Sequence, residues 1–213
     1  MSQEFTTVLV APLADSTNLI LSVEIRLADL GFRLDPRLCR VEFDSERGVF
    51  DETADAPLSI NQSLSARNSV AEWLGFATEV WSEDLMAYVL VGRTTEWINV
   101  YIDLDLRAIR RMARTVRESL YPLLETIAQC FGAKVGFSDV NLSYKPVSRA
   151  QALKAIGNNP ENPGFSSSLG LISADTMSNA EITVTWGDTF TVEQRPSGYW
   201  ILIHNDFLDN FTE

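Results

Sequence analysis

The chain has 213 residues and a formal net charge of −12, with 29 acidic side chains, 17 basic side chains and a single histidine, His204. Hydrophobic residues make up 46% of it, which is enough for one globular core at this length. The negative charge makes nucleic acid and anionic membranes poor partners, and the scarcity of histidine and cysteine removes the residue types on which most catalytic and metal sites depend.

The amino terminus and the cysteines indicate the compartment. The first fifteen residues lack a cationic start and are interrupted by Pro12, so we expect no signal peptide. No window reaches the roughly 18 apolar residues of a membrane span. Cys39 and Cys130 are isolated, which is typical of a reducing cytosol, although a bridge between them stays open. We therefore expect a soluble cytoplasmic protein that uses no cofactor or metal.

The first half of the chain alternates between strand and helix patterns. Strands are expected at Phe5–Val10, at Leu38–Phe43 paired with Gly48–Phe50, and in a hairpin of Met86–Val91 with Trp97–Asp103. Helices are expected at Ser16–Leu30, which Gly31 would end, and from Ser65 to about Val80. The polar segment Asp44–Ser63 between them predicts an exposed acidic loop.

The strongest pattern is helical and lies in the middle of the chain. Apolar residues recur at helical spacing at Ile109, Met112, Val116, Leu120, Leu123, Ile127 and Phe131, and Gly132 follows as a stop signal. The spacing predicts a long amphipathic helix from about Leu106 to Phe131, with Pro122 as a kink. Asp105 would be its N-cap.

The remaining segments predict a meander. A strand is expected at Lys134–Phe137, a short helix near Ser148–Ile156, and strands at Leu169–Ser173, Glu181–Trp186, Thr189–Glu193 and Tyr199–His204. The predicted fold is α+β, a mainly antiparallel sheet with one long amphipathic helix and shorter helices packed on it. Residues 1–213 would form a single domain, in which the loop 157–168 is the one candidate for a subdomain boundary.

Charge is distributed unevenly along the chain. Residues 1–106 carry −11 and residues 155–213 carry −7, while residues 107–154 carry +6. The basic segment includes a strip of arginines on the predicted long helix, at Arg107, Arg110, Arg111, Arg114 and Arg117. Such a strip usually pairs with the acidic remainder of the same protein, and the alternative is a contact for an acidic surface or a phosphate backbone.

The strand before this helix has two different faces. Ile98, Val100 and Ile102 belong to the core, whereas Trp97, Asn99, Tyr101 and Asp103 form an amphipathic face that suits a protein contact or packing under a loop. Asp103 and Asp105 are also spaced like carboxylates that hold a divalent cation. They are the basis of an alternative function, a carboxylate-dependent hydrolase or transferase.

Acidity without catalytic motifs favours a non-enzymatic protein that binds and masks a basic partner, such as a bacterial immunity protein or antitoxin that inhibits a cationic toxin. A subunit of a larger assembly is a further alternative. The oligomeric state is left open by the sequence. Residues expected to contact the partner are carboxylates that attract it and aromatic anchors: Asp51, Glu52, Asp55, Trp81, Glu83, Asp84, Trp97, Tyr101, Asp206 and Asp209.

Overall fold

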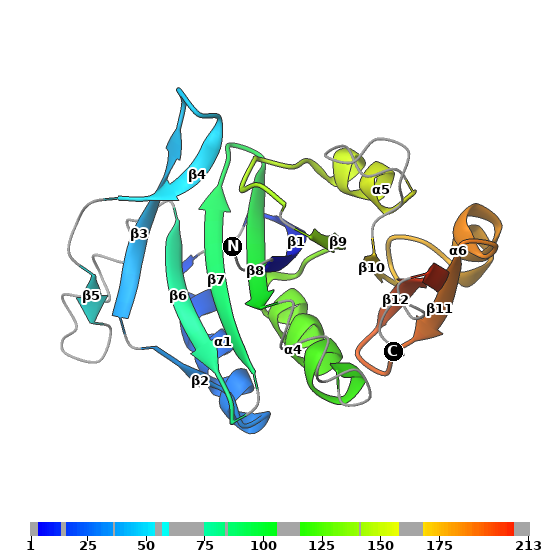
Figure 1. The fold of residues 1–213 in the computed structure, drawn as a ribbon, viewed down its shortest axis with the longest axis horizontal. Coiled ribbons are helices and arrows are strands. Elements are labelled where there is room, and N and C mark those ends of the chain that lie inside the picture. The colour runs from blue at the N-terminus through cyan, green and yellow to red at the C-terminus, as the bar shows by residue number, and fades with distance from the viewer. Residues whose placement is uncertain are drawn as a thin grey trace.

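A computed structural model of the chain describes residues 4–13, 16–35, 37–53, 57–59, 75–83, 85–105, 116–140, 142–157 and 168–206. Within these ranges the protein is a mixed α and β fold built on one large, twisted, antiparallel sheet (Figure 1). The main path of the sheet runs β11-β12-β10-β9-β1-β8-β7-β6-β3-β4, with β2 paired to β6 and β5 paired to β3.

The central strands are long and are formed by residues far apart in the sequence. β1 pairs with both β8 and β9, so the amino-terminal strand lies in the middle of the sheet. The strands are β1 (Glu4–Pro12), β2 (Arg33–Leu34), β3 (Arg37–Asp44), β4 (Val49–Glu52), β5 (Leu58–Ser59), β6 (Phe76–Trp81), β7 (Met86–Arg93), β8 (Trp97–Asp105), β9 (Val135–Val140), β10 (Leu169–Ser173), β11 (Phe190–Gln194) and β12 (Tyr199–His204).

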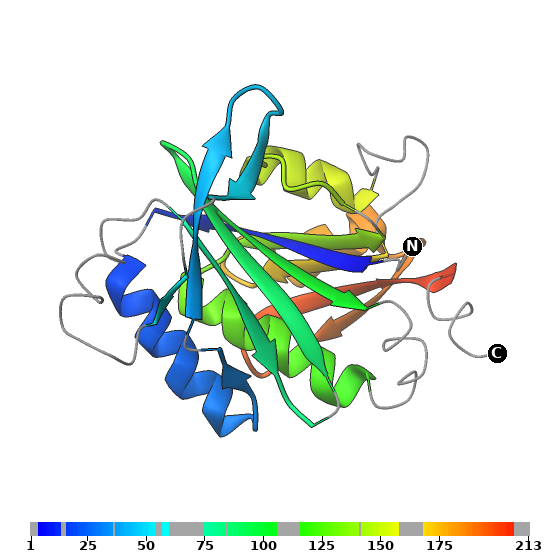
Figure 2. The same cartoon turned by 60° about the vertical axis from the view of Figure 1, so that its left-hand side comes forward.

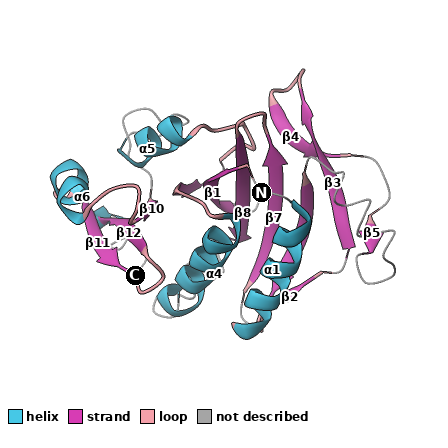
Figure 3. Cartoon of the chain, turned by 180° about the vertical axis from the view of Figure 1, so that it is seen from behind, coloured by secondary structure: helices cyan, strands magenta, loops and turns pink. Residues whose placement is uncertain are grey.

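Four helices are found in the described part of the chain: α1 (Ser16–Asp29), α4 (Val116–Phe131), α5 (Arg149–Gly157) and α6 (Asn179–Trp186). α1 and α4 pack against each other and lie side by side on one face of the sheet (Figures 2 and 3). α5 and α6 contribute to the core on the opposite face. None of these four helices has the length and hydropathy needed to cross a membrane.

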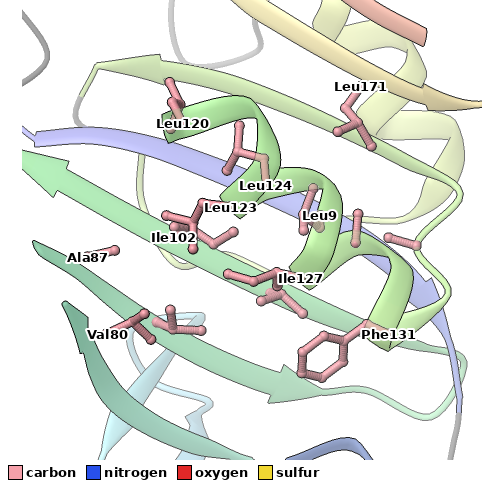
Figure 4. Packing of buried hydrophobic residues seen from close by; sticks show 14 of the residues in the cluster. Leu9, Val80, Ala87, Ile102, Leu120, Leu123, Leu124, Ile127, Phe131 and Leu171 are labelled. Carbon is pink, nitrogen blue, oxygen red and sulfur yellow. The ribbon is translucent and has the colours of Figure 1, made fainter. Parts of the chain in front are cut away.

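The main core lies between α4 and the centre of the sheet (Figure 4). Leu123, Leu124 and Ile127 of α4 are fully buried against Leu9 of β1 and Ile102 of β8. Side chains alternate between the two faces along a strand. Every second residue of the central strands therefore points into this core, and the residues between them point to the other face of the sheet. A second core forms there, where Ala152 and Ile156 of α5 and Ile182 of α6 pack with aromatic residues of the sheet.

Much of the predicted fold is confirmed. α1 begins at Ser16 as expected and ends before Gly31, whose φ of +81° is a left-handed conformation suited to glycine. The antiparallel pair of β3 and β4, the hairpin of β7 and β8, the helix α5 and the final strands β10 and β12 match the expectations closely. The mixed α and β class and the large antiparallel sheet are also as predicted.

The prediction of one long helix from about Leu106 to Phe131 was wrong. The described helix α4 begins at Val116 and has 16 residues, so the four helices are all short. β8 continues through Leu104 and Asp105, which pair with Phe5 and Glu4 of β1. Asp105 therefore ends a strand and does not cap α4. Residues 106–115, which carry Arg107, Arg110, Arg111 and Arg114 of the predicted strip, lie outside the described residues, as does the side chain of Arg117.

Three other segments differ from the expectation. Glu181–Trp186 is part of the helix α6, because Ser178 and Glu181 form a capping box at its start. Phe76–Val80, predicted as the end of a helix, belongs to the strand β6 and pairs with β7. The expected acidic loop Asp44–Ser63 contains the strands β4 and β5. Residues 158–167, in which a subdomain boundary was considered, lie outside the described residues.

Candidate functional site

Carboxylates gather on one face of the sheet, opposite α1 and α4. The antiparallel register places Glu79, Tyr88, Asp103 and Thr6 in a row across β6, β7, β8 and β1, and the next row pairs Trp81 with Met86 and Asp105 with Glu4. Residues two apart on a strand share a face, so both rows lie on the same side. We name this surface the acidic face, and its carboxylates are Glu4, Glu52, Glu79, Asp103, Asp105 and Asp139.

The acidic face is open to solvent around a buried centre. Glu4, Glu52, Glu79 and Asp105 are exposed and Asp139 is half-buried. Asp103 at the centre is only 6% exposed. Arg37 of β3 lies close enough to Glu79 to interact with it electrostatically, but its guanidinium makes its hydrogen bonds to Asp35. The described part of this surface is therefore strongly negative.

Two tyrosines connect these carboxylates. The hydroxyl of Tyr88 donates a hydrogen bond to Glu52, and the hydroxyl of Tyr144 donates one to Oδ2 of Asp103. Burial raises the pKa of each tyrosine, and the carboxylate beside it raises the pKa further. Both hydroxyls therefore stay protonated and serve as donors. They fix the positions of one exposed and one buried carboxylate.

Burial perturbs the titration of the Asp103 carboxyl group. Burial raises its pKa above the ordinary value, the hydrogen bonds from Tyr144 and Thr6 partly offset this effect, and the negative charge of Glu4 adds to it. Its Oδ1 atom is buried and has no well-formed hydrogen bond to any described residue. A buried carboxylate oxygen without a well-formed hydrogen bond is costly, which makes Asp103 a candidate contact for a donor from outside the described residues.

The segment 142–148 crosses the sheet over β8, and the polar face of this strand holds it. Asn99 makes two hydrogen bonds to the backbone of Val147, and the hydroxyl of Tyr101 donates to the carbonyl oxygen of Lys145 at 2.5 Å. Tyr101 and Tyr144 pack edge to face, with ring centroids 5.3 Å apart. Tyr101 is fully buried and Trp97 is half-buried in this layer. Most of the predicted contact face of β8 thus packs under a loop.

The tip of the hairpin between β6 and β7 borders the acidic face. Met86 is 62% exposed and lies directly across from Trp81, which is half-buried. Trp81 and Glu83, both expected to contact a partner, line an open groove of about 670 Å³ together with Phe32, Arg33 and Pro122. Aromatic residues and methionine are enriched in protein interfaces, and here both lie beside the carboxylates of the acidic face.

The other predicted contact residues are scattered. Asp51 and Glu52 lie on β4 at one end of the sheet, whereas Asp206 follows β12 near the other end (Figure 1). Asp51 pairs with Arg47. Asp55, Asp84 and Asp209 lie outside the described residues. The structure therefore brings Glu52 to the acidic face and Trp81 to its border, but it does not gather the predicted set on one surface.

Sequence reasoning missed several residues of the acidic face, namely Glu4, Glu79, Tyr88, Asp139 and Tyr144. Glu79 and Tyr88 could have been found, because each occupies an alternate position of a short strand-like run. The positions of Glu4 and Asp139 depend on the pairing of β1 with β8 and β9, which spans most of the chain and leaves no local signal.

The chemistry available at other polar residues is limited. Asp103 and Asp105 share a face of β8, yet no group of three potential metal ligands is found among the described residues. Cys39 and Cys130 are both free, and burial raises the pKa of each thiol. His204 packs edge to face on Phe190, and its Nδ1 accepts a hydrogen bond from the amide of Asp206 at 3.2 Å. These contacts give the histidine a structural role.

Comparison with known proteins supports the fold and gives no family. No protein-family model and no curated protein match the sequence. Among solved structures, the chain is similar to the Pseudomonas aeruginosa T6SS protein PA0821, with a TM-score of 0.50 and 12% sequence identity. The match covers 94% of this chain and 65% of that chain, so this chain spans less than two thirds of the length of PA0821. At this identity the likeness concerns the fold alone.

Proposed function

We propose that the protein is a non-enzymatic binding module that engages a basic protein through the acidic face and masks it. The observation that carries the proposal is the gathering of carboxylates from five strands beside the Trp81–Met86 pair. Exposed carboxylates attract a cationic partner over long distances, and a few apolar anchors at the centre of an interface retain it. The acidic face offers the carboxylates, and the Trp81–Met86 pair at its border offers the apolar anchors.

The partner that fits this surface best is a cationic toxin, and the module would then be of the immunity or antitoxin type. The net charge of −12 favours rapid capture of such a partner. The structural neighbour carries a T6SS name, which places a similar fold in a bacterial secretion context and motivates the same proposal here. We further propose that the protein acts in the cytoplasm.

The proposal is tested by finding the partner and measuring whether it is masked. The protein is crosslinked in cells of its native organism and the partner is identified and purified. Its activity is then titrated with the protein. We expect inhibition that is complete near equimolar amounts. Failure to recover a protein partner, or a partner that keeps its full activity when saturated, would contradict masking.

A matched pair of variants assigns the inhibition to the acidic face. Glu79→Gln with Asp105→Asn removes two charges from this surface, while Glu96→Gln with Asp188→Asn removes two exposed charges elsewhere. Only the first variant should weaken binding by about tenfold or more, since short-range charge complementarity acts locally. Equal loss in both would show that net charge matters and the acidic face does not.

A further inference from the structure

Asp103 is a buried carboxyl group with no cationic partner among the residues that the structure describes. It is only 6% exposed, Tyr144 donates to its Oδ2, and Thr6 of the neighbouring strand also contributes a hydrogen bond, yet its Oδ1 has no hydrogen bond of good geometry within the described structure. The charged group that acts on it electrostatically in the described structure is Glu4, which is also negative. Among the described residues no cation forms an ion pair with Asp103. A positively charged donor is therefore the group that would stabilise it most.

The aromatic neighbours indicate which cation fits. Tyr88 lies directly across from Asp103 in the β7–β8 register, and Tyr144 contacts Asp103 through its hydroxyl. A guanidinium is planar, stacks on aromatic rings and is more weakly hydrated than an ammonium group. It also presents several N–H donors in a rigid fork, which suits a carboxylate whose other oxygen is already bound by a tyrosine.

We propose that Asp103 is the receptor for an arginine side chain of the basic partner, which binds beside Tyr88 and Tyr144 with Glu4 and Asp105 at the rim. This inference rests on the proposed function and adds the chemistry of the contact. The guanidinium donates to Oδ1 of Asp103, and Tyr144 keeps its hydrogen bond to Oδ2. The surrounding carboxylates attract any cation, while Asp103 and the tyrosines select arginine.

The test uses two five-residue peptides, acetylated and amidated, that are identical except for a central arginine or a central lysine. Binding to the full chain is followed by NMR titration of backbone amides. We expect the arginine peptide to bind about tenfold more tightly, because charged hydrogen bonds with good geometry are that much stronger. The largest shifts should fall on Tyr88, Asp103 and Tyr144. Equal affinities, or shifts elsewhere, would overturn the proposal.

Two variants separate the selection of arginine from the general attraction of cations. Asp103→Asn should abolish the preference for arginine. Asp105→Asn removes the same charge two residues along the same face, and it should weaken both peptides equally while the preference remains. If Asp103→Asn fails to fold, the peptide comparison on the unaltered chain still decides. A preference for arginine that survives in a folded Asp103→Asn variant would contradict the proposal.

The outcomes distinguish this inference from the proposed function. If the peptides bind equally but a basic protein is captured and inhibited, the masking function stands and the arginine receptor is wrong. If arginine is selected at Asp103 but no basic protein is masked, the receptor stands and the masking function is wrong.

Discussion

The side-chain amide of Asn99 forms two hydrogen bonds to the backbone of Val147: Nδ2 donates to the carbonyl oxygen at 2.7 Å, and Oδ1 accepts from the N–H at 3.1 Å. Asn99 is fully buried, so water cannot replace these bonds. Asn99→Ala should lower the free energy of unfolding by about 2–4 kcal/mol, because it leaves two backbone groups unsatisfied. Urea denaturation measures this loss.

A matched control for Asn99 is Asn205→Ala, at an exposed position, which should cost less than about 1 kcal/mol. Asn99→Asp should also destabilise the protein, since a carboxylate accepts from the N–H but cannot donate to the carbonyl oxygen. A loss below about 0.5 kcal/mol in Asn99→Ala would show that the segment 142–148 is held by other contacts.

Asp103 should make the protein less stable as the pH rises. Its pKa is raised in the folded state, so the folded protein binds more protons than the unfolded chain between the ordinary pKa of Asp and the raised value. The contribution of Asp103 to the free energy of unfolding is present at low pH and is lost as the pH rises through the folded-state pKa. Asp103→Asn should remove this part of the pH dependence.

The measurement is chemical denaturation of both proteins at several pH values from about 4, near the ordinary pKa of Asp, up to about 8. The Asp103→Asn variant should gain stability relative to the unaltered protein as the pH increases. Carboxyl groups that do not interact with Asp103 titrate equally in both proteins and cancel in the difference. A difference that does not change with pH would contradict the burial of a titrating Asp103.

Ser178 begins α6 through a capping box, in which its hydroxyl accepts from the Glu181 N–H and the Glu181 carboxylate accepts from the Ser178 N–H. Ser178→Ala should lower the free energy of unfolding by about 1 kcal/mol. The Ser178 hydroxyl also donates to the Glu181 carboxylate at 2.7 Å, and this bond, together with the one from the Ser178 N–H, lowers the pKa of Glu181. The loss should therefore be largest at neutral pH and shrink as the pH falls through that pKa. Thermal unfolding at two pH values tests this.

Metal addition tests the alternative that Asp103 and Asp105 serve catalysis. We expect millimolar Mg²⁺ or Mn²⁺ to leave the melting temperature unchanged, because a ligand that binds the folded state must raise it. The control is EDTA-treated protein. A rise that disappears in Asp103→Asn would favour a carboxylate-dependent hydrolase or transferase.

The errors of sequence reasoning have identifiable causes. Ser178 and Glu181 carry a capping box signal that is visible in the sequence, yet the β-branched residues after them resemble a strand. Phe76–Trp81 alternates like a strand, but it was joined to the preceding helical pattern. Apolar spacing predicted the buried face of α4 correctly from Leu120 to Phe131, because that face depends on local periodicity alone.

The candidate site depends on contacts that local patterns cannot reveal. Asp103 lies between Tyr88 and Thr6 because β1 inserts between β8 and β9, and its hydroxyl partner comes from Tyr144, 41 residues away. The sequence predicted negative charge and aromatic anchors as the features of a contact surface. It could not place Glu4, Glu79 and Asp139 on one face, because this requires the register of the whole sheet.

The association rate of the purified partner, measured by stopped flow at several salt concentrations, tests the central claim most directly. The account predicts rapid association that slows as salt increases, and Glu79→Gln with Asp105→Asn should lower both the rate and its salt dependence. Trp81→Ala should instead mainly speed dissociation. Association that is independent of salt, or unchanged by the two substitutions on the acidic face, would contradict the account.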